Sequence, residues 1–265
     1  MRPVRTETKA FLFGAPIGTL GGLIGLGGAE FRLPILKAVF QCATHRAVAL
    51  NLAISLLTLV SSLAVRVSVV PPRSVVEWLP VLGGLTGGSM AGAYMGAAYA
   101  SRLSVERLER FIVVLLVGIG IALLVEGFFP LRSAGIDASA LLRVAAAVVL
   151  GVGIGMVSSL LGVAGGEVII PTLVLVFGAD IKTAGTLSVM ISLPTVGVGI
   201  WRYARRGSYE RADLRALVLP MGVGSLAGAF VGGCLVPYVP GGALKVGLGI
   251  ILIVSAIRIF RHRGA

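Results

Sequence analysis

Two glutamates occupy matching positions in stretches that are otherwise apolar. Glu30 lies in the run Gly25–Pro34, and Glu167 lies in the run Gly162–Pro171. A charged side chain at the centre of a membrane costs at least about 2.5 kcal/mol on insertion scales, so two in equivalent places indicate a function. Three functions are open. Each carboxylate could cap the helix that follows it, carry a proton as substrate moves, or bind a cation together with the other carboxylate.

The glycines and prolines around these glutamates predict helices that break inside a membrane. Clustered glycines relax the backbone where a helix ends, and a proline is tolerated near the start of the next helix. Backbone N–H groups freed at such a break lie at the positive end of a half-helix and can bind an anion. Close helix packing is the alternative use of glycine, but it explains neither the glutamates nor the short segments that follow. The predicted substrate contacts in the two runs are Gly25, Gly27, Gly28, Ala29, Glu30 and Pro34, and Gly162, Gly165, Gly166, Glu167 and Pro171.

A stripe of small polar residues follows each run. Asn51, Ser55 and Thr58 are spaced by three or four residues and therefore share one helical face. Such a stripe could line a substrate path, or it could join helices through hydrogen bonds of about 0.6 kcal/mol each. The pattern recurs at Ser188, Ser192 and Thr195. The predicted substrate contacts in the stripes are Asn51, Ser55, Ser188 and Ser192.

Arg32 breaks the symmetry between the two runs. It follows Glu30 by two residues, whereas Ile169 stands at the equivalent place in the second run. Arg32 could form a salt bridge with Glu30, or it could favour anions at the site.

Continuous hydrophobicity predicts ten segments. They are 10–28, 33–42, 46–66, 76–99, 108–129, 141–162, 168–178, 183–203, 214–236 and 243–260. Eight approach the ~20 residues that span a hydrocarbon core, whereas the second and seventh are about half as long. Short, Gly- and Pro-interrupted segments in corresponding places are the sequence pattern of a transporter binding site. Elsewhere, Gly87, Gly88, Gly92 and Gly96 predict a closely packed helix surface.

The chain is an internal duplication. Residues 14–64 align without a gap on 151–201, and residues 88–94 align on 224–230 after the register changes by one residue. We therefore predict a first membrane repeat at 1–135 and a second at 136–265. An odd number of segments in each repeat would insert the two in opposite senses, as a 5+5 inverted repeat.

Composition places the chain in a membrane. Hydrophobic residues make up 57% of it and charged residues only 13%, against about 25% charged in a soluble domain. The net charge of +12 comes from basic residues that flank apolar segments, so it predicts membrane topology rather than nucleic-acid binding. The apolar stretch after Lys9 continues to about Leu26 and predicts a first transmembrane segment rather than a cleaved signal.

The distribution of basic residues predicts that both termini lie in the cytoplasm. The predicted inside loops carry Arg46, Arg107 and the basic run between 202 and 215, which we interpret as a topology determinant that touches anionic headgroups. The predicted outside loops hold little more than Arg66, Arg73, Arg132, Arg143 and Lys182.

The sequence lacks the residue patterns of disulfide frameworks, metal sites and nucleotide-binding sites. Cys42 and Cys234 form no CxxC pair, and with His45 and His262 as the only histidines neither a disulfide framework nor a metal site is predicted. We expect no cofactor, since no nucleotide-binding motif occurs. A membrane-embedded enzyme would have to use the paired glutamates as acid and base.

The whole pattern resembles the TauE/SafE family, the sulfite exporters or toluene-sulfonate-uptake permeases. The resemblance covers nearly the whole chain. It is carried by the duplicated Gly-rich loops ending in Pro34 and Pro171, the turn at Arg205-Arg206-Gly207 and the Gly-Ser-x-Ala-Gly-Ala helix. It implies a bacterial inner-membrane permease for sulfite, sulfonates or related small anions, with the loop glycines framing the substrate path. The family usually has an apolar residue where Glu30 and Glu167 stand here.

The sequence therefore predicts an all-α secondary transporter of a small anion, working by alternating access between two repeats. The paired glutamates make proton coupling a hypothesis. Lipid and the anion are the expected partners, nucleic acid is not, and a homodimer is compatible with the sequence. The alternatives from other classes are an anion channel and the membrane-embedded enzyme.

Overall fold

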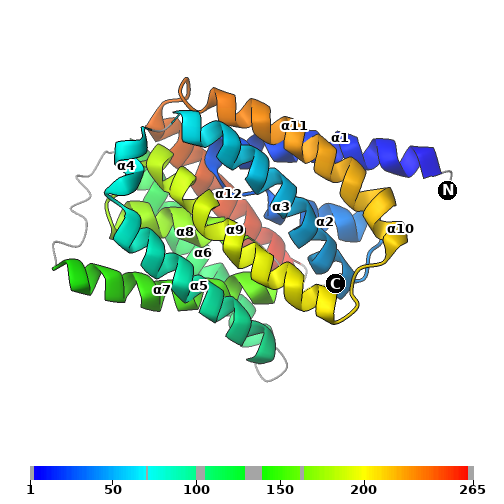
Figure 1. Cartoon of the computed structure of the whole chain (residues 1–265), viewed down its shortest axis with the longest axis horizontal. Helices are drawn as coiled ribbons and strands as arrows, with labels where there is room; N and C mark the ends of the chain where they lie inside the picture. Colours follow the sequence, from blue (N-terminus) through cyan, green and yellow to red (C-terminus); the bar gives the residue numbers. More distant parts are fainter. Residues whose placement is uncertain (1–2, 70, 100–104, 129–138, 162–163, 262–265) are drawn as a thin grey trace.

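The computed structural model describes residues 3–69, 71–99, 105–128, 139–161 and 164–261, and every element in these ranges is a helix (Figure 1). The predicted first repeat holds α1 (Pro3–Ile24), α2 (Ala29–Ala38), α3 (Thr44–Val69), α4 (Pro72–Val76), α5 (Leu79–Tyr99) and α6 (Val105–Phe128). The second holds α7 (Ala140–Leu161), α8 (Gly166–Pro171), η1 (Thr172–Val176), α9 (Ile181–Arg205), α10 (Arg211–Asp213), η2 (Leu214–Val218), α11 (Leu219–Leu235) and α12 (Gly241–Arg261), of which η1 and η2 are π-helical.

Helices occupy all ten predicted segments. Within the described residues, four helices are long and apolar enough to cross a membrane: His45–Ser68, Ala140–Ser159, Ile181–Arg205 and Arg211–Leu235. Shorter apolar helices cover Leu116–Phe128, Gly166–Val176 and Gly241–Ile257. The prediction missed the short helix α4 and both π-helical stretches, because a π-turn leaves no mark in a hydrophobicity pattern. The number of crossings stays a prediction.

Large apolar side chains cover the outside of the helices. Val114, Leu141 and Val149 expose 67%, 82% and 71% of their surface. A face of this kind is stable against lipid but not against water.

The closest helix pairs each join one helix from either repeat. α1 packs along α11, α5 along α7, and α6 along α12. Glycines make the first two contacts possible: a Cβ on Gly18 would overlap the backbone of Ser225, and a Cβ on Gly92 would overlap that of Val152. The predicted close packing of Gly88, Gly92 and Gly96 is confirmed. For Gly87 it is wrong, because nothing lies within 4 Å of a Cβ at that position.

These pairings create two bundles. The first bundle consists of α1, α2, α3 and α11, and the second bundle consists of α5, α7, α8 and α9. The contacts of α1 with α11, α3 with α11 and α2 with α3 correspond under the duplication to those of α7 with α5, α9 with α5 and α8 with α9. Helices α3 and α9 meet between the bundles (Figure 1). In Figure 1, α3 runs toward the upper left and α9 toward the lower right, the relation that an inverted repeat requires. Beside the bundles, Lys245 of α12 donates to Glu126 of α6 at 2.8 Å.

Candidate functional site

Both predicted helix breaks are present. The first loop (Gly25–Gly28) separates α1 from the ten-residue α2, and its glycines 25, 27 and 28 have φ of 96°, 79° and 70°. In the second loop, described at Ala164 and Gly165, Gly165 has φ of 80° and precedes α8. Residues that carry a side chain rarely adopt such φ values, so glycine is required at these points. Gly162, predicted as part of this loop, lies outside the described residues.

The two loops meet. A Cβ built on Gly166 would lie 3.0 Å from Leu26 Cα and 3.3 Å from the Gly25 carbonyl O. A Cβ built on Gly27 would lie 3.6 Å from Ala164 Cβ. The first loop also touches the start of α9, since a Cβ on Gly25 would overlap the backbone of Gly185. Of the predicted site residues, Gly25, Gly27 and Gly166 are therefore brought together between the bundles.

Arg32 is the centre of the polar contacts in the first bundle. Its side chain is fully buried and donates to oxygens of the first loop, α3 and α11. The acceptors are the Gly27 carbonyl O, Ser55 Oγ at 2.9 Å, Thr58 Oγ1 at 2.7 Å, Ser225 Oγ at 3.2 Å and Asn51 Oδ1 at 3.3 Å. Asn51 in turn donates to the Ala29 carbonyl O at 2.9 Å. The first polar stripe thus joins helices through Arg32, which is the second of the two uses predicted for it.

Glu30 does not pair with Arg32. No ion pair between them is present among the described residues, and Arg32 uses neutral oxygens instead. Both carboxyl oxygens of Glu30 are buried and accept no hydrogen bond from another described residue. Capping of α2 by Glu30 is therefore wrong, while its roles with a proton or a cation stay predictions. Glu167 is 5% exposed.

The second polar stripe differs from the first. Ser188 and Ser192 are fully buried, and neither hydroxyl has a hydrogen-bond partner among the described residues. Ser188 Oγ faces the start of α8, 3.2 Å from the Cβ position of Gly166. Thr195 donates to the Ile191 carbonyl O, and its Oγ1 lies 2.8 Å from Ser89 Oγ of α5.

Arg66 lies inside α3 and is 1% exposed, so its assignment to an outside loop is wrong. It donates to the carbonyl O atoms of Gly22 at 3.0 Å and Leu23 at 2.6 Å. These are among the last carbonyls of α1, where the helix dipole favours a cation. Further donor contacts at 3.4 Å reach Lys182 and Thr186 of α9. The arginine fixes the end of α1 from which the first loop departs.

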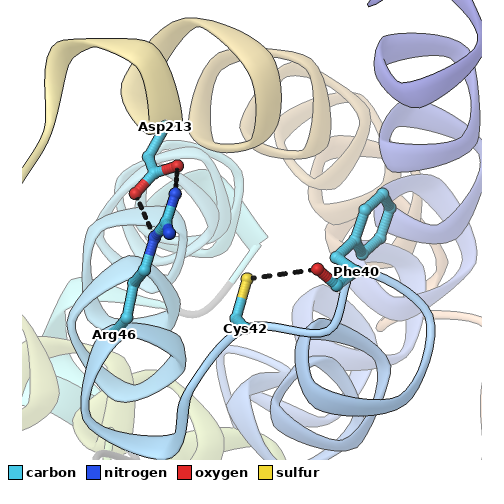
Figure 2. Close-up of polar contacts among 4 residues, drawn as sticks. All are labelled: Phe40, Cys42, Arg46 and Asp213. Atoms are coloured by element: carbon cyan, nitrogen blue, oxygen red, sulfur yellow. Dashed lines mark hydrogen bonds and ion pairs between the residues drawn. The ribbon is translucent and has the colours of Figure 1, made fainter. Parts of the chain in front are cut away.

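A second ion pair closes one end of the first bundle. Arg46 of α3 donates two hydrogen bonds to the carboxylate of Asp213 in α10 (Figure 2). Beside it, Cys42 Sγ lies 3.8 Å from the Phe40 carbonyl O. Asp213 was missed by sequence reasoning; its signal was an acidic residue between Arg211 and Arg215. Arg66 and Ser225 were also missed as members of the site.

Within the described residues, no group of three His, Cys, Asp or Glu side chains could hold a metal ion. The polar groups of the site are hydroxyls, carbonyls, the Asn51 amide, the guanidinium groups of Arg32 and Arg66, and two carboxyls. Such an arrangement offers recognition of small ions or polar solutes rather than a nucleophile or redox group.

Helices with lipid-compatible faces and two broken helices that meet between bundles define a membrane transporter. The family model of the sulfite exporter TauE/SafE matches residues 2–123 and 147–265. The chain belongs to the TauE/SafE family of multi-pass membrane transporters. It is also 26% identical over 230 residues to the "Probable membrane transporter protein YdhB" of Bacillus subtilis (strain 168), covering 86% of this chain and 90% of that protein. No solved structure matches.

Proposed function

We propose that this protein is a secondary transporter of a small anion, sulfite or a sulfonate, in the bacterial inner membrane with both termini in the cytoplasm. One observation supports an anionic substrate. The Arg32 guanidinium, one helical turn from the first loop, is fully buried and makes no ion pair among the described residues. A buried positive charge without an ion pair attracts an opposite charge, because the surroundings screen it weakly. The N–H groups at the start of α2 add positive potential at the same place.

The movement that exposes this place to either side would be a rocking of the first bundle against the second. The two repeats themselves are not separable bodies, because the glycine surfaces of α1 and α11, and of α5 and α7, hold each repeat to the other. Between the bundles the contacts are fewer and include the two loops. A substrate held at the loops would then meet one side of the membrane in each position of the bundles.

Purified protein in liposomes tests this proposal. Uptake of labelled sulfite and of an aryl sulfonate should saturate with concentration and show counterflow when the liposomes are preloaded. Arg32→Gln should reduce uptake more than tenfold, whereas the exposed Arg215→Gln should not change it. Uptake that rises linearly without counterflow would show a channel instead. Absence of uptake for every sulfite, sulfonate and carboxylate offered would refute anion transport.

A further inference from the structure

Corresponding polar groups have different hydrogen-bond partners in the two repeats. In the first, the Arg32 guanidinium binds the stripe of α3, Ser225 of α11 and the Gly27 carbonyl O. The duplication assigns the counterparts Ser188, Ser192 and Thr195 on α9, Ser89 on α5 and the Ala164 carbonyl O. All five counterparts are buried. The counterpart of Arg32 itself is Ile169, which carries no charge.

Two hydroxyl groups of this second set form a hydrogen bond with each other. In the first repeat, one guanidinium nitrogen of Arg32 bridges Thr58 and Ser225. In the second repeat the corresponding hydroxyls, those of Thr195 and Ser89, lie 2.8 Å apart and bond directly. In the second repeat, therefore, a ligand cannot occupy the position that corresponds to this Arg32 nitrogen.

The other part keeps unsatisfied oxygens. The second guanidinium nitrogen of Arg32 binds Ser55 Oγ and the Gly27 carbonyl O, and its Nε binds Asn51. The corresponding groups are Ser192, Ala164 and Ser188. The hydroxyls of Ser188 and Ser192 are fully buried and have no partner within the described part of the chain. A buried polar group without a partner destabilises the fold, so a ligand that supplies the missing partner is favoured here.

The chemistry of the neighbours selects a cation. Glu167 follows Gly166, whose Cβ position lies 3.2 Å from Ser188 Oγ, and Glu167 is buried without an ion pair to any described basic residue. A carboxylate here opposes an anion and favours a cation. The Ala164 carbonyl belongs to the unwound segment after α7, and such carbonyls bind Na⁺ in other transporters with broken helices.

We propose that the second repeat binds one Na⁺ ion at Ser188, Ser192, the Ala164 carbonyl and Glu167, in the place that Arg32 holds in the first repeat. Arg32 is in effect a cation fixed to the chain, and the Na⁺ ion is its exchangeable counterpart. The ion bridges the second loop to α9, so its binding stabilises the second bundle in one arrangement. As a coupling ion it would extend the proposed function, but its binding does not depend on the identity of the transported anion.

Thermal unfolding of the purified protein tests the binding. Titration is done with NaCl against KCl and N-methylglucamine chloride at constant ionic strength, without substrate. At ten times the dissociation constant, Na⁺ should raise the folding equilibrium constant about elevenfold, seen as a Na⁺-specific rise in Tm. Ser192→Ala should lose this rise. It should nevertheless fold at least as stably as the wild type without Na⁺, since it removes an unpaired hydroxyl. The matched variant Ser55→Ala, in the first repeat, should keep the Na⁺ response.

A second variant converts one repeat into the other. Ile169→Arg places a guanidinium beside the second set of oxygens and should abolish the Na⁺ response, whereas Ile169→Met should retain it. Equal Tm in Na⁺, K⁺ and N-methylglucamine for the wild type would overturn the site, as would an undiminished Na⁺ response in Ser192→Ala. A Na⁺ response without transport of any anion would leave the site standing and refute the proposed function. Anion uptake without any Na⁺ response would refute the Na⁺ site and leave the proposed function standing.

Discussion

Replacing Arg32 by methionine should destabilise the protein measurably. The change keeps an unbranched apolar stem at this position but removes the donors that join the first loop, α3 and α11. Ser55 and the Gly27 carbonyl each lose the hydrogen bond that Arg32 donates, at about 1–3 kcal/mol for each buried group. Thr58 and Ser225 keep bonds to the carbonyls of Ile54 and Gly14, so they add little. Relief from burying the guanidinium offsets part of this loss.

The net expected loss is about 3 kcal/mol, which corresponds to a fall in Tm of about 6–12 °C for a chain of this size. Tryptophan fluorescence of the detergent-purified protein during heating measures it. Arg32→Lys should fall between wild type and methionine, because lysine keeps the charge but cannot reach several acceptors at once. The exposed Arg215→Met is the control and should change Tm by no more than a degree or two. A Tm for Arg32→Met equal to that of the wild type would refute the idea that this network holds the first bundle together.

Three further predictions concern packing, topology and coupling. Gly92→Leu should prevent α5 from packing on α7 and yield aggregated protein in size-exclusion chromatography, while Gly87→Leu, facing open space, should remain monodisperse. Single cysteines introduced at the exposed positions Arg206 and Arg73 in a Cys-free background should label from the cytoplasmic and the outer side, respectively; labelling of both from the cytoplasm would contradict the inverted topology. Glu167→Gln should reduce ion-driven uptake more than it reduces substrate binding, and equal uptake under an imposed gradient would remove this residue from the coupling.

The sequence predicted those features that periodicity and duplication record. The ten segments, the breaks at Gly25–Gly28 and before Gly166, and the polar stripe of α3 all follow from hydrophobicity, clustered glycines and three-to-four-residue spacing. The hydrogen-bond partners of Arg32 could not be predicted from the sequence. Its side chain is long enough to reach α11, and no local sequence pattern shows where α11 packs. The same holds for Asp213, which finds Arg46 across 167 residues of chain.

The exchange of helices between repeats was also beyond sequence reasoning. A duplication shows which residues correspond, but not whether α1 packs on its own repeat's α5 or on α11. The glycine faces of both candidates look alike in the sequence. Only the three-dimensional arrangement decides that Gly18 meets Ser225.

The mixed composition of the bundles has a consequence for synthesis at the ribosome. The glycine face of α1 is complete when residue 24 has entered the membrane, yet its partner α11 ends at residue 235. At ~5–20 residues per second, α1 waits roughly 10–40 s for that partner. During this time its small-residue face meets lipid, a chaperone or the translocation machinery instead. The second bundle waits less, since α7 follows soon after α5. We therefore expect the second bundle to assemble first, and the N-terminal helix to dock last although it is made first.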